Sequence, residues 1–556
     1  MAKKIDYEKW SKEELIKEIT RIKETTYGLV WHRDLPEEKI DVLINPDART
    51  PSEMFPNEMA GKPFPVLKEV KSRAIQTDEE KPVNIVIQGD NYRSLAVLNF
   101  THQAAIDLIY IDPPYNTGEK DFKYNDSYVD VDDPFRHSKW LAFMEKRLKL
   151  TKRLLKPAGV FFISIDNNEQ APLKMLCDEV FGDNNFLGML TWINKTKPVN
   201  SGKAKYQIQQ NIEYVLVYSN CSKQEFEGFM LATQGQRKYP LLDRMGRYRI
   251  VDIEDSDRGR KKRETMKFEI LGIKPGVGKR WKIGQEEIER LIKVGKIINL
   301  EGKIKRKIYQ KEESGVIESP FWSHLLEVGT AEGGKAELSE IIGHDHGFDT
   351  VKPLGLIENL LSHFSNDVTV LDYFAGSGTT AHAVLSTNSD GGKRQFILCT
   401  DNENNICTDI CYPRVSKVIE GYKSTSGQKV IGLGGNLKYY ATAFVKAEPT
   451  DKNKRKLVNE STEMLCIKEN AFELVQEVAD FKIFRNHDKC LGIIFHEDAI
   501  ADYKKAVKKI KGHFNTYTFS MTDDPHKEEF ADVADKVTLC AIPDVILKVY
   551  REIFRE

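Results

Sequence analysis

The chain has 556 residues, enough for roughly three or four domains. Apolar residues make up 40% and charged residues 30%, as in globular proteins, and no apolar run reaches the ~20 residues that a membrane span requires. The first residues lack the apolar core of a signal peptide, and eight scattered cysteines are typical of reduced thiols, so we expect a cytoplasmic protein with no membrane contact.

The charge is distributed unevenly along the chain, although the net charge is only −1. Residues 236–311 contain 23 Lys and Arg against 11 Asp and Glu, so the rest of the chain has an acidic excess. A basic excess confined to one segment is typical of a contact with nucleic acid.

The first 82 residues come before any regular alternation of strands and helices. Ser11-Lys-Glu-Glu14 is a capping box, and apolar residues follow at helical spacing, which predicts a helix over about residues 11–26. This helix either packs on the body of the protein or contacts a second subunit. Residues 45–82 contain six prolines and predict an extended arm.

A regular alternation begins at residue 83. Apolar runs predict strands, and segments with helical periodicity lie between them. The predicted strands are 83–87, 106–111, 160–165 and 211–218, and the predicted helices are 93–100 and 140–155. This alternation predicts an α/β fold with a Rossmann-like, doubly wound sheet.

The sequence Asp112-Pro113-Pro114-Tyr115 follows the apolar run 106–111 without a spacer. The prolines end the strand and stiffen the turn, and ligands bind at the carboxyl ends of strands in open α/β sheets. A carboxylate and the Pro113 carbonyl can accept the N–H groups of a nucleobase amine, and Tyr115 can stack on the base. Taken alone, these four residues could instead simply end the strand without binding a ligand.

Residues 225–320 interrupt the alternation and carry most of the basic excess, with aromatic residues interleaved. Such a composition suits an insert that lies on a nucleic-acid backbone, and a merely solvated basic surface is the alternative. The candidate DNA contacts are Arg258, Arg260, Lys261, Lys262, Arg263, Lys279, Arg280, Lys305, Arg306 and Lys307.

A second half of the sheet is predicted after the insert. The strand 368–373 leads into Phe374-Ala375-Gly376-Ser377-Gly378-Thr379, then a helix from about 381 to 387, a strand over 395–400 and the acids Asp401 and Glu403. Glycines let the backbone approach a nucleotide, and an acid about 20–30 residues later can bind ribose hydroxyls. The pattern alone leaves binding of NAD open.

The remaining segments carry less chemistry. Residues 412–424 predict a helix, and the chain after about 450 predicts a small α/β module without a catalytic constellation. The pairs Cys407/Cys411 and His344/His346 lack further ligands, so we expect no metal site.

Two motifs together resemble those of the amino-methylating DNA methyltransferases. Asp112-Pro-Pro-Tyr115 matches their Asp-Pro-Pro-Tyr motif, and Phe374-Ala-Gly-Ser-Gly-Thr379 resembles their S-adenosylmethionine motif, with Lys352-Pro353 resembling the Lys-Pro that precedes it. The catalytic motif comes before the cofactor motif, a circularly permuted order that resembles the β class of these enzymes.

The chain further resembles the modification (Mod) subunits of Type III restriction-modification systems over about residues 10–425. This resemblance rests on five short sequences: Tyr27-Gly-Leu-Val-Trp31, Gln88-Gly-Asp-Asn91, Trp192-Ile-Asn-Lys195, Asn402-Glu-Asn-Asn405 and Tyr412-Pro-Arg414.

The resemblance implies an adenine-N6 DNA methyltransferase with S-adenosylmethionine as cofactor. Its catalytic residues would be Asp112, Pro113, Pro114 and Tyr115, which grip a flipped-out base. Its cofactor residues would be Asp90, Asp112, Lys352, Phe374, Ala375, Gly376, Ser377, Gly378, Thr379 and Glu403, with Asp401 as the alternative to Glu403.

The implied partners are double-stranded DNA, a second copy of the chain and a helicase-nuclease restriction subunit. The alternatives are a solitary adenine or cytosine-N4 methyltransferase and a non-catalytic specificity subunit. The expected division is an N-terminal helix and arm (1–82), a catalytic half (83–224), a target recognition insert (225–320), a cofactor half (321–445) and a C-terminal module (446–556).

Overall fold

The computed structural model describes residues 63–519 and 526–542, a few isolated positions before residue 63, and Ile546. Short gaps lie at 79, 119, 126, 203, 258–262, 314, 345, 349, 447–449 and 487–488. Most of the predicted helix over 11–26, and Tyr27–Val30 of the resemblance, lie outside the described residues. The chain forms two compact units, Met1–Gly228 with Trp322–Glu556, and Phe229–Phe321.

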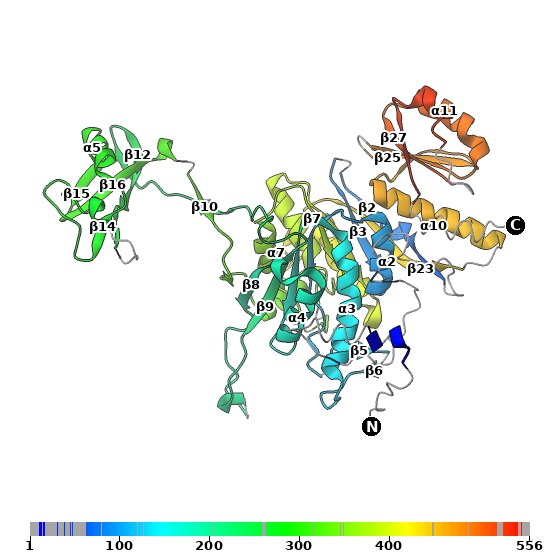
Figure 1. Cartoon of the computed structure of the whole chain (residues 1–556), viewed down its shortest axis with the longest axis horizontal. Helices are drawn as coiled ribbons and strands as arrows, with labels where there is room; N and C mark the ends of the chain where they lie inside the picture. The colour runs from blue at the N-terminus through cyan, green and yellow to red at the C-terminus, as the bar shows by residue number, and fades with distance from the viewer. Residues whose placement is uncertain are drawn as a thin grey trace. The chain divides into compact units, whose positions relative to one another are not determined.

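The larger unit is built on an 11-stranded sheet (Figure 1). Its strand order is β1-β23-β3-β20-β19-β4-β7-β9-β8-β18, with β2 also paired to β23. The strands are β1 (Phe64–Glu69), β2 (Ile75–Gln76), β3 (Val83–Gln88), β4 (Ile106–Ile111), β7 (Leu155–Ile165), β8 (Phe186–Ile193), β9 (Ile212–Ser219), β18 (His324–Leu325), β19 (Thr369–Asp372), β20 (Gln395–Thr400) and β23 (Asn436–Val445).

The central strands are parallel from β23 to β7, and antiparallel pairs flank them at β1–β23, β7–β9 and β9–β8. The central strands are rich in Val, Ile, Leu and Phe and are buried, as expected for parallel strands covered on both faces. The predicted α/β class is confirmed.

The sheet reverses its winding direction between β4 and β19. From β4 the chain passes through α3 (Arg136–Leu154) to β7 on one side, whereas from β19 it passes through α8 (Thr379–Thr387) to β20 on the other. Right-handed crossovers in opposite directions place the helices on opposite faces and open a crevice between the two strands. The carboxyl ends of β4 and β19 therefore flank a topological switch point.

Helices cover the sheet in two groups. One group comprises α2 (Asn91–Thr101), α3, α4 (Gln170–Phe181) and α10 (Asp451–Glu469), whose apolar residues join one large core cluster. The other comprises α6 (Ala331–Ile342), α7 (Leu354–Leu361), α8 and α9 (Tyr412–Glu420), which contact one another. No helix of the described residues is long and apolar enough to cross a membrane.

Two predictions of local structure are wrong. The extended arm over 45–82 includes β1 and β2, which join the main sheet because Phe64, Val66 and Leu67 bury their side chains in its core. The helix over 412–424 ends at Glu420, where Gly421 has φ +95° and opens the hairpin of β21 (Gly421–Lys423) and β22 (Lys429–Ile431).

The C-terminal part of the larger unit carries a separate five-stranded sheet. Its strands are β24 (Glu473–Glu477), β25 (Phe481–Asn486), β26 (Lys489–Ile494), β27 (His513–Thr518) and β28 (Val537–Cys540), and α11 (Ile500–Lys509) precedes β27. Residues 543–545 and 547–556 lie outside the described residues.

The smaller unit, Phe229–Phe321, has its own apolar core. A four-stranded sheet orders β11 (Leu241–Asp243), β12 (Gly246–Asp252), β16 (Lys303–Tyr309) and β15 (Ile297–Leu300), and α5 (Gln285–Lys293) packs beside it. Two further pairs join β10 (Ala232–Gln236) to β17 (Val316–Ser319) and β13 (Glu254–Ser256) to β14 (Lys279–Trp281).

Candidate active site at the ends of β4 and β19

The corner after β4 is held rigidly by its neighbours. Ile106–Ile111 is almost entirely buried, and the prolines that follow have no N–H to continue the ladder. The indole of Trp140, from α3, donates a hydrogen bond of 2.7 Å to the Pro114 carbonyl. The side chains of Asp112 and Tyr115 are thereby presented at the carboxyl end of the strand.

A buried charge cluster surrounds Asp112. The ammonium of Lys352 lies 2.9 Å from Asp112 Oδ2 and 3.3 Å from Oε2 of Glu213 on β9. Lys352 is 8% exposed and Glu213 7%. The cluster therefore places one ammonium group between two carboxyl groups.

The pKa values within this cluster diverge. Burial raises the pKa of Asp112 above its ordinary value, although Lys352 opposes this effect. Burial alone would also raise the pKa of Glu213, but Lys352 and the donors Asn194 and Tyr115 together lower it. Burial works to lower the pKa of Lys352, but the two carboxylates outweigh it and raise that pKa. Lys352 and Glu213 are therefore charged near neutral pH.

Tyr115 is fixed by the same cluster. Its hydroxyl donates a hydrogen bond of 2.8 Å to Glu213 Oε2, and Lys352 Nζ lies 4.9 Å from the ring centroid. The amide of Asn194 donates to the other oxygen of Glu213 at 2.8 Å. Glu213 thus holds the aromatic ring and the lysine at once.

Sequence reasoning missed Glu213. Its signal was present as a single carboxylate in the otherwise apolar strand Ile212–Ser219. An acid inside a buried strand needs a partner, but the partner Lys352 lies 139 positions away and is brought near only by the fold.

One acceptor in the cluster is unsatisfied. Asp112 Oδ1 is buried and has no hydrogen-bond partner among the described residues. A buried carboxylate oxygen without a donor is costly, and an incoming N–H group would satisfy it. The geometry therefore suits a ligand that presents an amine at the end of β4.

The end of β19 presents a glycine-rich turn beside this corner, since β19 and β4 are paired in the sheet. Gly376 and Gly378 have φ of +47° and +78°, a region that L side chains avoid. The carboxylate of Asp372 accepts hydrogen bonds from Phe374 N at 3.0 Å and from the Thr380 hydroxyl at 2.6 Å. Burial raises the pKa of Asp372 to about 7.

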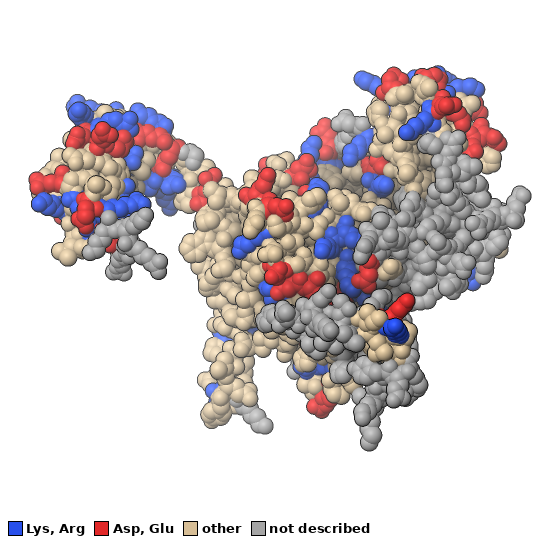
Figure 2. All heavy atoms as spheres, viewed as in Figure 1, with Lys and Arg blue, Asp and Glu red and all other residues tan. Residues whose placement is uncertain are grey.

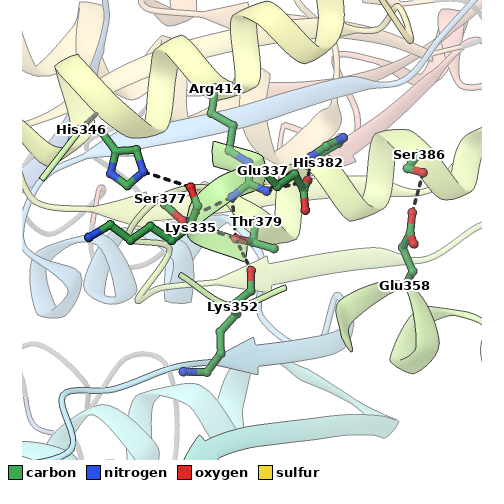
Figure 3. A network of polar contacts seen from close by, with 10 residues as sticks. All are labelled: Lys335, Glu337, His346, Lys352, Glu358, Ser377, Thr379, His382, Ser386 and Arg414. Carbon is green, nitrogen blue, oxygen red and sulfur yellow. Dashed lines mark hydrogen bonds and ion pairs between the residues drawn. The ribbon is translucent and has the colours of Figure 1, made fainter. Parts of the chain in front are cut away.

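The side chain of Arg414 points toward this turn and supports it (Figure 3). Its fully buried guanidinium donates to Thr379 Oγ1 at 2.7 Å and to Ser377 Oγ at 3.4 Å, and pairs with Glu337 at 3.3 Å. The Thr379 hydroxyl donates to the Lys352 carbonyl at 3.2 Å. In Figure 3 the Lys352 ammonium points away from this network, so Lys352 connects the turn to Asp112.

The other candidate cofactor residues lie at the ends of neighbouring strands. Asp90, after β3, caps α2 by accepting hydrogen bonds from the backbone N–H groups of Tyr92 and Arg93. Glu403, after β20, forms an ion pair with Lys123. Phe374 lies half-buried against Phe143 of α3. The choice between Glu403 and Asp401 as a ribose ligand stays a prediction.

Comparison with known proteins identifies the family. Residues 106–411, more than half of the chain, match the N6_N4_Mtase family of DNA methylases. This match spans both the Asp112 corner and the glycine-rich turn.

The chain belongs to the DNA methylase family.

Several curated relatives resemble this methylase. The Mod subunit of the Type III restriction-modification enzyme StyLTI of Salmonella typhimurium is 33% identical over 348 residues, covering 57% of this chain and 52% of that protein. The Type II methyltransferase M.KpnI of Klebsiella pneumoniae is 33% identical over 353 residues, covering 58% of this chain and 82% of that protein. The EcoP15I Mod subunit of Escherichia coli is 29% identical over 398 residues, covering 59% and 60%. The match thus spans about half the length of the StyLTI relative.

The candidate DNA contacts of this methylase lie in the smaller unit. Arg258, Arg260, Lys261 and Lys262 are outside the described residues. Four others are paired with acids: Lys279 with Glu254, Arg280 with Asp255 and Asp257, Lys305 with Asp252, and Lys307 with Asp243. Arg263 is exposed.

Arg306 differs from its neighbours on β16. It shares a face of the strand with the buried Ile304, and its Nε is buried without a hydrogen-bond partner among the described residues. Figure 2 shows blue and red side chains intermixed over the smaller unit. The basic excess of the sequence is therefore partly neutralised within the unit itself.

Proposed function

We propose that the chain is an S-adenosylmethionine-dependent DNA methyltransferase that methylates the N6 amine of adenine. The observation that carries this proposal is the meeting of two motifs at the switch point of one sheet. Asp112-Pro-Pro-Tyr115 ends β4, Phe374–Thr379 follows β19, and these strands are neighbours. Membership of the DNA methylase family and the similarity to Mod subunits support it.

The Asp112 corner would hold the amine of a flipped-out adenine. Asp112 Oδ1, which lacks a donor, and the Pro113 carbonyl accept its two N–H groups, while the ring of Tyr115 stacks on the base. Two acceptors in fixed positions orient the nitrogen so that its electron pair points at the reacting carbon. This is catalysis by position, because an aromatic amine is a poor nucleophile.

The glycine-rich turn would hold the cofactor. Phe374–Thr379, with Asp90, the Lys352 backbone and Glu403 or Asp401, forms the cradle, and left-handed glycines let the backbone approach the ligand. Bound S-adenosylmethionine supplies an electrophilic methyl group on a sulfonium. In that chemistry the N6–C bond would form as the S–C bond breaks, the sulfur would leave as a neutral thioether, and the displaced N6 proton would pass to solvent.

The catalytic strand comes before the cofactor strand in the chain, which is the permuted order of the β class. We propose that residues 225–320 are the target recognition domain between the catalytic half (83–224) and the cofactor half (321–445), that two copies act together, and that the protein works in the cytoplasm. Its DNA contacts would include Arg263, Lys279, Arg280, Lys305 and Lys307.

Transfer of a labelled methyl group to unmethylated duplex DNA tests the activity. We expect N6-methyladenine on nucleoside mass spectrometry with the wild type and a loss of about a hundredfold to a thousandfold in kcat for Asp112→Ala, as for removal of one group that contacts the reacting atoms. Asp498→Ala, which alters a 93% exposed side chain of the C-terminal sheet region, is the matched control. N4-methylcytosine as the product, or no product on any DNA, contradicts the proposal.

We propose further that a helicase-nuclease subunit partners the chain, as the similarity to Mod subunits suggests. Co-purification with a helicase-nuclease encoded beside the gene, together with ATP-dependent cleavage of unmethylated DNA, would support this assignment. Methylation without such a neighbour would instead favour a solitary enzyme, as the similarity to the Type II methyltransferase M.KpnI allows.

A further inference from the structure

A hairpin projects from the larger unit between β8 and β9 (Figure 1). Its described residues are 194–202 and 204–211, and Asn194 N donates to the Asn211 carbonyl at 2.9 Å to close its base. The side chain of Gln209 braces it from within, by accepting from Val199 N at 2.7 Å and donating to the carbonyls of Val199 and Ala204. The hairpin is therefore a built feature with a defined shape.

The hairpin combines positive charge with exposed apolar side chains. Residues 194–211 contain four lysines and no Asp or Glu. Lys195, Lys197 and Lys205 are exposed and form no ion pair with a described residue. Ile208 is 93% exposed and Tyr206 80%. In Figure 2 the projecting hairpin shows blue but no red side chains on the visible face.

This charge pattern differs from that of the smaller unit. There, Lys279, Lys305 and Lys307 are each paired with a carboxylate, which reduces their attraction for a polyanion. The lysines of the hairpin have no acid within their own segment to compensate them. The hairpin thus offers an uncompensated positive charge to a phosphate backbone.

The base of the hairpin touches the active site. Asn194, its first residue, donates to Glu213, and Glu213 accepts the hydroxyl of Tyr115 and pairs with Lys352. Each arm of about nine residues spans at most ~30 Å when extended, more than the ~12 Å width of the major groove. A duplex whose base enters the Asp112 corner therefore lies within reach of Tyr206 and Ile208.

We propose that the 194–211 hairpin is a second DNA-binding element, distinct from the inserted unit. Its Lys195, Lys197 and Lys205 contact phosphates, and its Tyr206 and Ile208 enter the base stack beside the flipped adenine. Apolar and aromatic wedges lower the cost of unstacking, because they replace the contacts that the extruded base leaves behind. The inference rests on the proposed function and names the residues that would help to extrude the target base.

Affinity for DNA tests the lysines without requiring activity. The full chain is titrated with a 40-bp duplex of arbitrary sequence, without methyl donor, over a range of salt concentrations. Lys195→Gln/Lys197→Gln/Lys205→Gln should reduce the slope of log affinity against log salt by about 0.9 for each lost phosphate contact. The matched control, Lys505→Gln/Lys509→Gln/Lys511→Gln, alters exposed lysines of the C-terminal region. An unchanged slope, or an equal loss in the control, overturns the phosphate contacts.

Extrusion of the base tests the apolar residues. With 2-aminopurine in place of the methylated adenine, Tyr206→Ala/Ile208→Ala should lower the fluorescence rise on binding and reduce kcat/KM about tenfold, the range of one lost stacking contact. A mismatch opposite the target adenine should restore the rate, because the mispaired base costs less to extrude. Leu474→Ala/Val475→Ala, on the exposed part of β24, is the control.

Two results would contradict the proposal that Tyr206 and Ile208 enter the base stack. One is a slow double variant that a mismatch does not rescue. The other is loss of a wild-type dimer on light scattering in Tyr206→Ala/Ile208→Ala, which would make these side chains a contact between subunits. Unchanged binding of S-adenosylmethionine by calorimetry shows that each variant is folded. Absence of methylation by the wild type would refute the proposed function itself, whereas the salt slope still tests the hairpin.

Discussion

At the scale of single residues, the site depends on a buried cluster of two carboxylates and one ammonium. Asp112 has its pKa raised mainly by burial, and the ammonium of Lys352, at 2.9 Å, limits that rise. In our proposal Asp112 acts as an ionised acceptor. The acid limb of the pH–rate profile should therefore report the pKa of Asp112, and residues around it should move that limb in predictable directions.

Replacing the lysine should shift activity to higher pH. Without the cation, the folded-state pKa of Asp112 rises further, so Asp112 becomes protonated at a higher pH as acid is added. In Lys352→Met we expect the acid limb of kcat to lie at higher pH than in the wild type. The measurement is kcat from pH 5 to 9 with saturating substrates, with exposed Lys489→Met as the control. An acid limb that stays in place or moves to lower pH would refute the role of the cation.

Replacing the second carboxylate should have the opposite effect. Glu213 raises the pKa of Asp112 by charge repulsion, so Glu213→Gln should move the acid limb to lower pH. The glutamine amide oxygen still accepts the Tyr115 hydroxyl, which keeps the ring in place. Opposite shifts in Lys352→Met and Glu213→Gln would identify electrostatics as the cause, and shifts in the same direction would point to a general loss of structure.

Asp372 should make the stability of the fold depend on pH. Its folded-state pKa of about 7 lies above the ordinary value of 3.8, so its stabilising contribution is complete below about pH 4 and is lost as the pH rises through 7. Asp372→Asn keeps the shape and removes the charge. As the pH rises from 5 to 8, the Tm of Asp372→Asn should therefore rise relative to the Tm of the wild type. A difference in Tm that is constant over this range would contradict the raised pKa.

At the scale of elements, the glycine-rich turn depends on backbone conformation. Gly378 has φ +78°, and an added Cβ would lie 3.2 Å from Cys411 Sγ. The left-handed conformation costs an L residue roughly 1–2 kcal/mol, so Gly378→Ala should weaken S-adenosylmethionine binding about tenfold. Calorimetry on the full chain measures this, with Gly188→Ala, a strand position with open space, as the control. Equal affinities of Gly378→Ala and wild type would argue against this turn as the cofactor cradle.

The strands also show how much of the fold could be predicted from the sequence. The buried strands β3, β4, β19 and β20 were predictable because apolar runs bounded by turn residues identify them without knowledge of their neighbours. β1 was not predictable, because Pro63 before it and Pro65 within it concealed a strand that pairs with β23, more than 370 residues later. Local patterns identify elements, but pairing across the chain decides which of them join a sheet.

The same limit applied to the site. Asp112, Tyr115 and the glycines occur in contiguous motifs, whereas Glu213 and the support of the turn by Arg414 depend on contacts between distant segments. The basic residues of the insert were visible as composition, but their pairing with acids on adjacent strands was not. The motifs therefore identify the candidate site residues, whereas the residues that hold them in place are identified only by contacts in the fold.

At the scale of the whole molecule, the two compact units separate two tasks in our proposal. The unit Phe229–Phe321 has its own core, and its ends meet where β10 pairs with β17 and the rings of Phe229 and Phe321 lie 4.9 Å apart. Deletion of 229–321, with Gly228 joined to Trp322 through a short glycine linker, should leave S-adenosylmethionine binding intact and abolish site-specific methylation. Retained methylation at the same DNA sequence would show that recognition lies elsewhere.

The central claim is that the corner after β4 methylates adenine at N6. The most direct test is single-molecule sequencing of genomic DNA from cells that carry the wild-type gene, Asp112→Ala, or no copy. Our account predicts N6-methyladenine at one short sequence with the wild-type gene and unmodified adenine there in the other two. Modification that persists in Asp112→Ala, or that falls on cytosine, would contradict it.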